Sequence, residues 1–202
     1  MKFVIMDVVN ADFSSLEGTC CYCSAESAAL IRQQISATPL RALHLIGTGD
    51  YHYVSLFFLE RIADPFELVL YDHHPDDQAA AFGGELLSCG SWVREARRLP
   101  MLGASYLVRH SNDLHNLSPG GLPVYISLDL DVLSPEYART DWDQGDLTLK
   151  ELQLSLDELA GRREIVGADI CGGITRAQGG TDADIALNRS TYRVLKDWFS
   201  SL

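Results

Sequence analysis

The sequence predicts an α/β protein in which a single domain, residues 1–202, is built on a mainly parallel sheet. Short apolar runs alternate along the chain with stretches whose apolar residues recur at helical spacing, a pattern typical of repeated βα units. The 202 residues suffice to bury a core without disulfides or a structural metal. Hydrophobic residues make up 47% of the chain and charged residues 22%, which is the balance of an ordinary globular protein.

The first elements alternate strand, helix and strand. The apolar run Val4–Val9 meets Asp7 too soon for a signal segment or a membrane span, so it predicts a buried first strand. The stretch from Ser24 to about Ser36 has apolar residues at helical spacing, and Ser24 is a suitable N-cap. Leu40–Ile46 then predicts the next strand.

A glycine-containing turn, residues 47–49, separates that strand from an amphipathic helix predicted over Tyr53–Ile62. Asp64-Pro65 ends this helix, because the residue before a proline is disfavoured in helical conformation. The apolar run Phe66–Tyr71 predicts a third strand directly afterwards.

The second half of the chain continues the alternation. Thr148 and Glu151 have the spacing of a capping box, which predicts the start of a helix there. The remaining predicted elements are a strand over Pro123–Leu130, a helix over Leu149–Leu159, a strand over Glu164–Ile170 and a closing helix over Asn188–Trp198.

Charge and cysteine content exclude several functions. The formal net charge of -12, with no local basic stripe, disfavours nucleic acid and anionic membranes as partners. The odd number of cysteines, five, shows no disulfide spacing and favours a reducing, cytoplasmic location. Cys20, Cys21 and Cys23 share one loop. Since no second ligand pair follows at zinc-site spacing, a structural or incidental role is favoured over a zinc clip.

The most informative segment follows the strand Phe66–Tyr71. It places Asp72, His74 and Asp76 at alternate positions, so in extended chain their side chains share one side. These side chains would point together into a crevice at the carboxyl end of the strand, which is where open α/β sheets bind ligands. His73 points the other way.

A second acidic segment repeats this arrangement after another strand. Asp129 and Asp131 lie two residues apart at the end of an apolar run, where unpaired carboxylates would be costly to bury. His52 follows a third strand end, beyond the turn 47–49. Four carboxylates and two imidazoles form a hard ligand set that suits Mn²⁺, and six ligands favour two ions over one.

The three segments resemble the metal motifs of the ureohydrolase family, which contains arginase, agmatinase and formimidoylglutamase. The matching stretches are Gly-Thr-Gly-Asp-Tyr-His at 47–52, Asp-His-His-Pro-Asp at 72–76 and Ser-Leu-Asp-Leu-Asp at 127–131. The resemblance continues through 145–151, the strand ending at Asp169 and the closing helix. The chain is shorter than typical members, which suggests trimmed loops and an altered interface in a possible homo-oligomer.

The resemblance implies a three-layer α/β/α fold, two manganese ions per chain and hydrolysis of a C–N bond in a small molecule. One ion would be held by His52, Asp72, Asp76 and Asp129, and the other by Asp72, His74, Asp129 and Asp131. Asp72 and Asp129 would bridge the two ions.

The sequence departs from the family pattern at three positions. Ser134 precedes Pro135 where the family usually has Asp, a change that leaves the predicted ligands intact. Cys89 precedes Gly90 where the family has a proton-shuttling histidine, so Cys89 is either a small buried residue or a catalytic group facing the site. Together with Asp76 it is a candidate for proton transfer.

The third departure is at the predicted substrate site. Gly172 lies three residues after Asp169, where the family has a glutamate that pairs with the substrate guanidinium. We therefore expect a substrate other than arginine, with Gly172 and Asp143 as candidate substrate-binding positions.

Two further hypotheses compete with this hydrolase of guanidino, amidino or amide compounds. A metal-binding but catalytically degenerate homologue with a structural or regulatory role would explain the changes at Cys89 and Gly172. A deacylase on a related sheet would bind a single ion.

Overall fold

The computed structural model describes residues 6–79 and 86–202 of the chain. Within them a six-stranded sheet has the order β1-β3-β8-β7-β4-β6. Every neighbouring pair is parallel, which confirms the predicted fold class. The strands are β1 (Asp7–Asn10), β3 (Ala42–Gly47), β4 (Phe66–Tyr71), β6 (Leu102–Val108), β7 (Val124–Asp129) and β8 (Ile165–Cys171).

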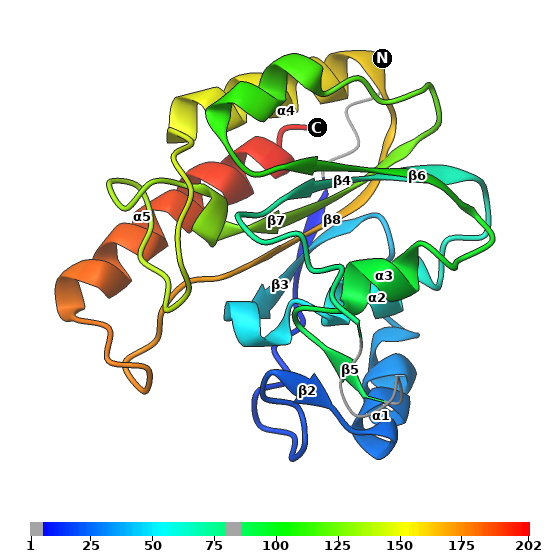
Figure 1. Ribbon diagram of the computed structural model, residues 1–202, viewed down its shortest axis with the longest axis horizontal. Coiled ribbons are helices and arrows are strands. Elements are labelled where there is room, and N and C mark those ends of the chain that lie inside the picture. Colours follow the sequence, from blue (N-terminus) through cyan, green and yellow to red (C-terminus); the bar gives the residue numbers. More distant parts are fainter. Residues whose placement is uncertain (1–5, 80–85) are drawn as a thin grey trace.

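Helices cover both faces of this sheet and make a three-layer α/β/α arrangement (Figure 1). One face carries α1 (Ala25–Ile35), α2 (Val54–Leu59) and α3 (Trp92–Ala96). The other carries α4 (Leu149–Arg162) and α5 (Asp182–Phe199). A short antiparallel pair, β2 (Tyr22–Cys23) and β5 (Leu87–Ser88), lies outside the main sheet. No helix among the described residues is long and apolar enough to cross a membrane.

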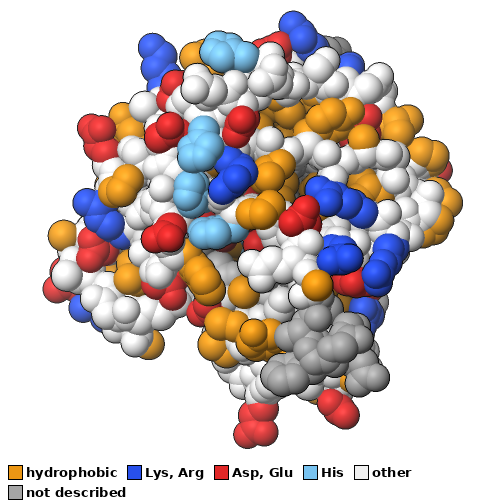
Figure 2. Space-filling model, viewed as in Figure 1, with side chains coloured by type: hydrophobic (Ala, Val, Ile, Leu, Met, Phe, Trp, Pro, Cys, Tyr) orange, Lys and Arg blue, Asp and Glu red, His pale blue; other side chains and the backbone are white. Residues whose placement is uncertain are grey.

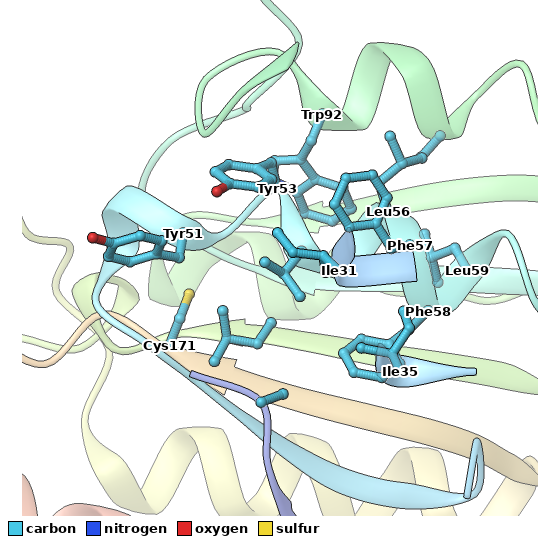
Figure 3. Close-up of a cluster of buried hydrophobic side chains, with 14 of the residues drawn as sticks. Ile31, Ile35, Tyr51, Tyr53, Leu56, Phe57, Phe58, Leu59, Trp92 and Cys171 are labelled. Carbon is cyan, nitrogen blue, oxygen red and sulfur yellow. The ribbon is translucent and has the colours of Figure 1, made fainter. Parts of the chain in front are cut away.

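Buried aromatic side chains fill the space between the sheet and its first helical layer (Figure 3). Phe57 and Phe58 of α2 and Trp92 of α3 are fully buried there. Burial of an aromatic side chain stabilises the fold by about 2–3 kcal/mol. The segment that connects β3 to α2 therefore leaves a rigid core and returns to it, which restrains the residues it carries.

Most predicted elements agree with the structure to within a few residues. Ser24 caps α1, since its Oγ accepts a hydrogen bond of 3.1 Å from the backbone N–H of Ser27. The predicted capping box of Thr148 and Glu151 begins α4. Val4 and Ile5 of the predicted first strand lie outside the described residues. The prediction that this strand is buried is wrong for its described part, because β1 lies at the edge of the sheet and is mostly exposed.

The last helix begins earlier than we predicted. A second capping box, formed by Thr181 and Asp184, starts α5 at Asp182 and not near Asn188. The sequence analysis also omitted β6 and α3. Residues of β6 are only half-buried at this edge of the sheet, so an apolar run is less distinct there.

Candidate metal centre

Two neighbouring strands bring the acidic segments to the same edge of the sheet. β4 and β7 pair in parallel with Tyr71 opposite Leu128, so Asp72 after β4 lies level with Asp129 at the end of β7. Asp72 and Asp129 are 1% and 4% exposed. Parallel pairing in this register therefore forces the two carboxylates into proximity below the protein surface.

His52 joins these carboxylates from the loop after β3. It ends the short 3-10 helix Gly49–Tyr51, and its Nδ1 lies 3.1 Å from Asp72 Oδ2 and 3.3 Å from Asp76 Oδ2. The same Nδ1 atom of His52 lies 3.7 Å from Asp129 Oδ2. Gly49 is required here, because a Cβ atom would lie 3.0 Å from Asp129 Oδ2.

A second group of ligand atoms adjoins the first and shares Asp72. His74 Nδ1 lies 2.7 Å from Asp131 Oδ2 and 3.7 Å from Asp72 Oδ1. Asp131 is held in place by the backbone N–H of His73, which donates to its Oδ1 at 2.9 Å. The structure thus brings together all six residues that the sequence predicted as metal ligands. Figure 2 shows histidine side chains gathered in a column on this face of the molecule.

The charge of this cluster fits divalent cations. Four carboxylates converge here, and the residues separate into groups whose ligand atoms lie within 4.8 Å of one another. Burial, with the neighbouring Asp131 and Asp72, raises the pKa of Asp129 to about 8. Burial and Asp72 raise the pKa of Asp131 to about 6. These shifts mean that ionised carboxylates repel one another, and bound cations would remove that repulsion.

A hydrogen-bonded series behind His52 fixes its orientation. Ser127 Oγ donates to Asp169 Oδ1 at 2.7 Å and lies 2.8 Å from His52 Nε2. Because the serine proton is committed to Asp169, Ser127 accepts from Nε2–H, and Nδ1 keeps its lone pair for a metal. Asp169 is fully buried, and its Oδ2 has no hydrogen-bond partner within the described chain.

Two buried side chains near the cluster were not predicted as site residues. Trp92 Nε1–H donates to Asp76 Oδ2 at 2.7 Å. Cys171 Sγ lies 3.1 Å from Asp129 Oδ2. Ser127, by contrast, could have been found from sequence, since it lies two residues before Asp129 and therefore on the same side of β7.

The cluster forms the floor of a cleft of about 300 Å³. The residues above the ligands are Cys21, Tyr22, Gly49, Gln78, Ser88, Cys89, Gly90 and Trp142. The half-buried thiol of Cys89 is thus part of the cleft wall. Burial and the carboxylates of Asp76 and Asp50 raise its pKa to about 12.

Gly172 and Asp143, the two predicted substrate-binding residues, are not among those lining this cleft. Gly172 has a φ of +107°, and a Cβ atom there would overlap Asp129 Oδ1. Position 172 therefore has no room for a side chain between β8 and Asp129. Asp143 is exposed on the surface.

Comparisons with known proteins agree with this geometry. The model of the arginase family matches residues 85–172. An uncharacterized protein of Thermotoga maritima is 33% identical over 141 residues, which are 63% of this chain and 56% of that protein. An arginase of Glycine max is 29% identical over 163 residues, covering 65% of this chain and 46% of that protein. The chain thus spans about half the length of these relatives.

The solved structure of formimidoylglutamase from Bacillus subtilis has the same fold. It superimposes with a TM-score of 0.66 at 12% identity and covers 96% of this chain and 86% of its own. The chain is thus similar to arginase-family proteins in sequence over part of its length, and to formimidoylglutamase in fold. The family match includes Asp129 and Asp131, whereas His52, Asp72, His74 and Asp76 precede it.

Proposed function

We propose that the protein is a manganese-dependent hydrolase that cleaves a C–N bond in a small guanidino, amidino or amide compound. The observation that carries the proposal is the convergence of His52, Asp72, His74, Asp76, Asp129 and Asp131 on the floor of one cleft. These donors are oxygen and imidazole nitrogen, which suit a hard or borderline divalent ion.

The proposed roles follow the two groups of ligand atoms. His52, Asp72, Asp76 and Asp129 would hold one ion, and Asp72, His74, Asp129 and Asp131 the other. When bound, such a pair of ions supplies electrophilic activation of the substrate and an acidified solvent molecule.

The side chains around the ions would orient the ligands and move protons. The series Asp169–Ser127–His52 holds the His52 ring with Nδ1 toward the cleft. Trp92 restrains one oxygen of Asp76, a carboxyl group whose pKa is raised by burial. Asp76 is thus suited to receive a proton at its carboxylate and deliver it to the departing nitrogen, with Cys89 as the alternative donor from the cleft wall.

The cleft wall supports a neutral substrate. Among the described residues above the metal ligands, none carries a formal charge. A guanidinium bound there would lack an anionic partner, and loss of one member of a buried charge pair costs about 3–5 kcal/mol. Because each 1.4 kcal/mol changes affinity about tenfold, that cost corresponds to a reduction in affinity of roughly several hundred-fold or more. We therefore propose uncharged amides over cationic amidinium and guanidinium compounds, which include arginine and agmatine.

The test is a substrate screen with the Mn²⁺-loaded protein. Carboxamides and formimino compounds are compared with arginine and agmatine, and Asp129→Asn serves as the matched inactive control. We expect the wild-type protein to release ammonia or an amine from a neutral compound, and Asp129→Asn to release none. Efficient arginine or agmatine hydrolysis would contradict the proposed specificity.

A second candidate function is metal binding without turnover. The high pKa of Cys89 favours it, because a thiol with a pKa of about 12 exchanges its proton poorly near neutral pH. Two bound ions per chain together with no turnover across the panel would support this function and exclude the first.

A further inference from the structure

A second group of metal-ligating atoms lies beside the cleft, at residues that the proposed hydrolysis does not use. Cys20 and Cys21 belong to the segment before β2, and Asp50 belongs to the 3-10 helix Gly49–Tyr51. Cys21 Sγ lies 3.3 Å from Asp50 Oδ1 and 4.0 Å from Cys20 Sγ. The three ligand atoms all lie within 4.8 Å of one another.

These distances match the edges of a tetrahedral thiolate site. With Zn–S bonds of about 2.3 Å, two sulfurs on one tetrahedral ion are about 3.8 Å apart. A sulfur and a carboxylate oxygen on the same ion are about 3.5 Å apart by the same geometry. The observed Cys20–Cys21 and Cys21–Asp50 separations differ from these values by only a few tenths of an ångström, and the third edge, Cys20 to Asp50, is within 4.8 Å.

The environment of Asp50 leaves a charge for a cation to balance. Its side chain is 9% exposed, and it forms no ion pair among the described residues. Neutral groups solvate it instead: Trp142 Nε1–H and the Cys21 thiol approach Oδ1, and Gln178 Nε2–H approaches Oδ2. A buried carboxylate solvated only by neutral donors is a favourable anion for a positive ion.

An ion can reach these atoms from solvent. Cys20 is exposed, and it lines a cavity of about 640 Å³ together with Asp50 and Tyr51. This cavity is distinct from the cleft above the acidic cluster, which Cys21 lines. Three protein ligands would leave the fourth tetrahedral position to a water molecule from the cavity.

We propose that Cys20, Cys21 and Asp50 form a binding site for a thiophilic divalent ion, of which Zn²⁺ and Cd²⁺ are the representatives. Both thiols lose their protons to solvent as the ion binds. Thiolate ligands select such ions against Mn²⁺ and Mg²⁺, which prefer the oxygen-rich cleft.

The bound ion has a structural consequence for the cleft. It joins the segment before β2 to the 3-10 helix that ends at His52. Cys21 and Trp142 also line the cleft, and both contact Asp50 Oδ1. The ion therefore fixes one edge of the cleft wall. The spacing of the cysteines alone did not predict this site, because the third ligand comes from a segment distant in sequence.

The experiment titrates Cd²⁺ into fully reduced protein that has been saturated with Mn²⁺. Cadmium thiolates absorb in the ultraviolet through ligand-to-metal charge transfer, whereas oxygen and imidazole ligands do not. We expect the band to saturate at about one ion per chain, with release of about two protons measured in buffers of different ionisation enthalpy. Cys20→Ser and Cys21→Ser should each lower the Cd²⁺ affinity by at least tenfold and reduce the band.

Matched cysteine variants control this experiment. Cys23→Ser alters a buried thiol two residues from Cys21, and Cys171→Ser alters the thiol beside Asp129. Both should retain the band. Because Cys20 is exposed, Cys20→Ser tests the site even if Cys21→Ser fails to fold. A band unchanged in Cys20→Ser, or one lost only in Cys171→Ser, would overturn the proposal.

Discussion

The floor and the wall of the cleft differ in how the fold holds them. The floor consists of residues at the ends of β4 and β7 and of His52, and each of its carboxylates is less than 10% exposed. The wall comes from the short pair β2 and β5 and from segments outside the main sheet, and its aromatic residues Tyr22 and Trp142 are 44% and 43% exposed. A sheet of fixed register thus carries the proposed metal ligands, whereas the proposed substrate contacts come from outside that sheet.

The β8 side of the floor shows how tightly it is packed. Gly172 N–H donates to Gly47 O at 3.0 Å, which joins the ends of β8 and β3 directly behind Asp129. A side chain at position 172 would displace Asp129. The glycine at this position is therefore coupled to the geometry of Asp129, and we expect Gly172→Glu to displace Asp129 and not to create a guanidinium site.

The largest expected effect is the loss of both metal ions in Asp129→Ala. Asp129 Oδ2 lies 3.7 Å from His52 Nδ1, and its Oδ1 accepts a hydrogen bond from the backbone N–H of Asp131; Asp129 is proposed to bridge the two ions. We expect the wild type to bind about two Mn²⁺ per chain and Asp129→Ala to bind neither ion tightly, measured by metal analysis after gel filtration.

His52→Ala is the matched variant for this comparison. His52 is proposed to bind only one of the two ions, together with Asp72 and Asp76, so the other ion should remain bound. Equal loss of metal in the two variants would contradict the assignment of Asp129 as a bridge, and a wild type that binds a single ion would contradict the binuclear site.

Gly172→Ala should destabilise the protein by more than backbone strain alone. A residue other than glycine at positive φ costs about 1–3 kcal/mol, and forced overpacking adds about 1–3 kcal/mol. Gly179→Ala isolates the first cost, since Gly179 has a φ of +95° and no described atom lies within 4 Å of the place that an alanine methyl group would take. Urea unfolding of the two variants gives the difference, and equal destabilisation would disprove the close contact with Asp129.

The contrast between floor and wall also explains what the sequence could predict. Asp72, His74 and Asp76 follow a continuous apolar run, and their alternate spacing predicted that they share one side of the chain, although they lie beyond the end of β4. The positive φ of Gly172 and the meeting of Cys21 with Asp50 depend on contacts between distant segments. No local pattern encodes such contacts, and for that reason the sequence predicted the ligands but not the surroundings of the cleft.

Ser127→Ala should weaken one metal site without abolishing it. The variant removes the hydrogen bond that orients His52, and losses of this kind reduce metal affinity by about 10- to 100-fold. Ser55→Ala is the control, because Ser55 Oγ lies 3.3 Å from Ser127 Oγ and is one step further from the His52 ring in this series. Calorimetric titration measures the Mn²⁺ affinity of both variants. An equal loss of affinity in the two would indicate that Ser127 has a packing role only.

The stability of the metal-free protein should fall as the pH rises from about 5 to about 8. The folded-state pKa values of Asp129 and Asp131, about 8 and about 6, exceed the unfolded value of about 3.9, so the folded state binds more protons in this range. Asp131 and Asp72 raise the pKa of His74 to about 10, which acts in the same direction. Thermal unfolding should show Mn²⁺ raising Tm more at pH 8 than at pH 5. A metal-free Tm that increases over this interval would contradict the buried repulsion.

The smallest expected effect concerns the thiol of Cys89, which belongs to the wall but faces the charges of the floor. Without metal, burial and the Asp76 carboxylate raise the pKa of Cys89 to about 12. Alkylation of Cys89 by iodoacetamide at about pH 7.5 should therefore be slow. Two bound cations reverse the local charge and should speed this alkylation several-fold. Mass spectrometry of the alkylated peptides measures the rate, and the buried Cys23, whose Sγ contacts Ser24 O, should show no such acceleration. If Mn²⁺ leaves the rate at Cys89 unchanged, the thiol does not sense the ions, and its role in proton transfer is excluded in favour of a packing role.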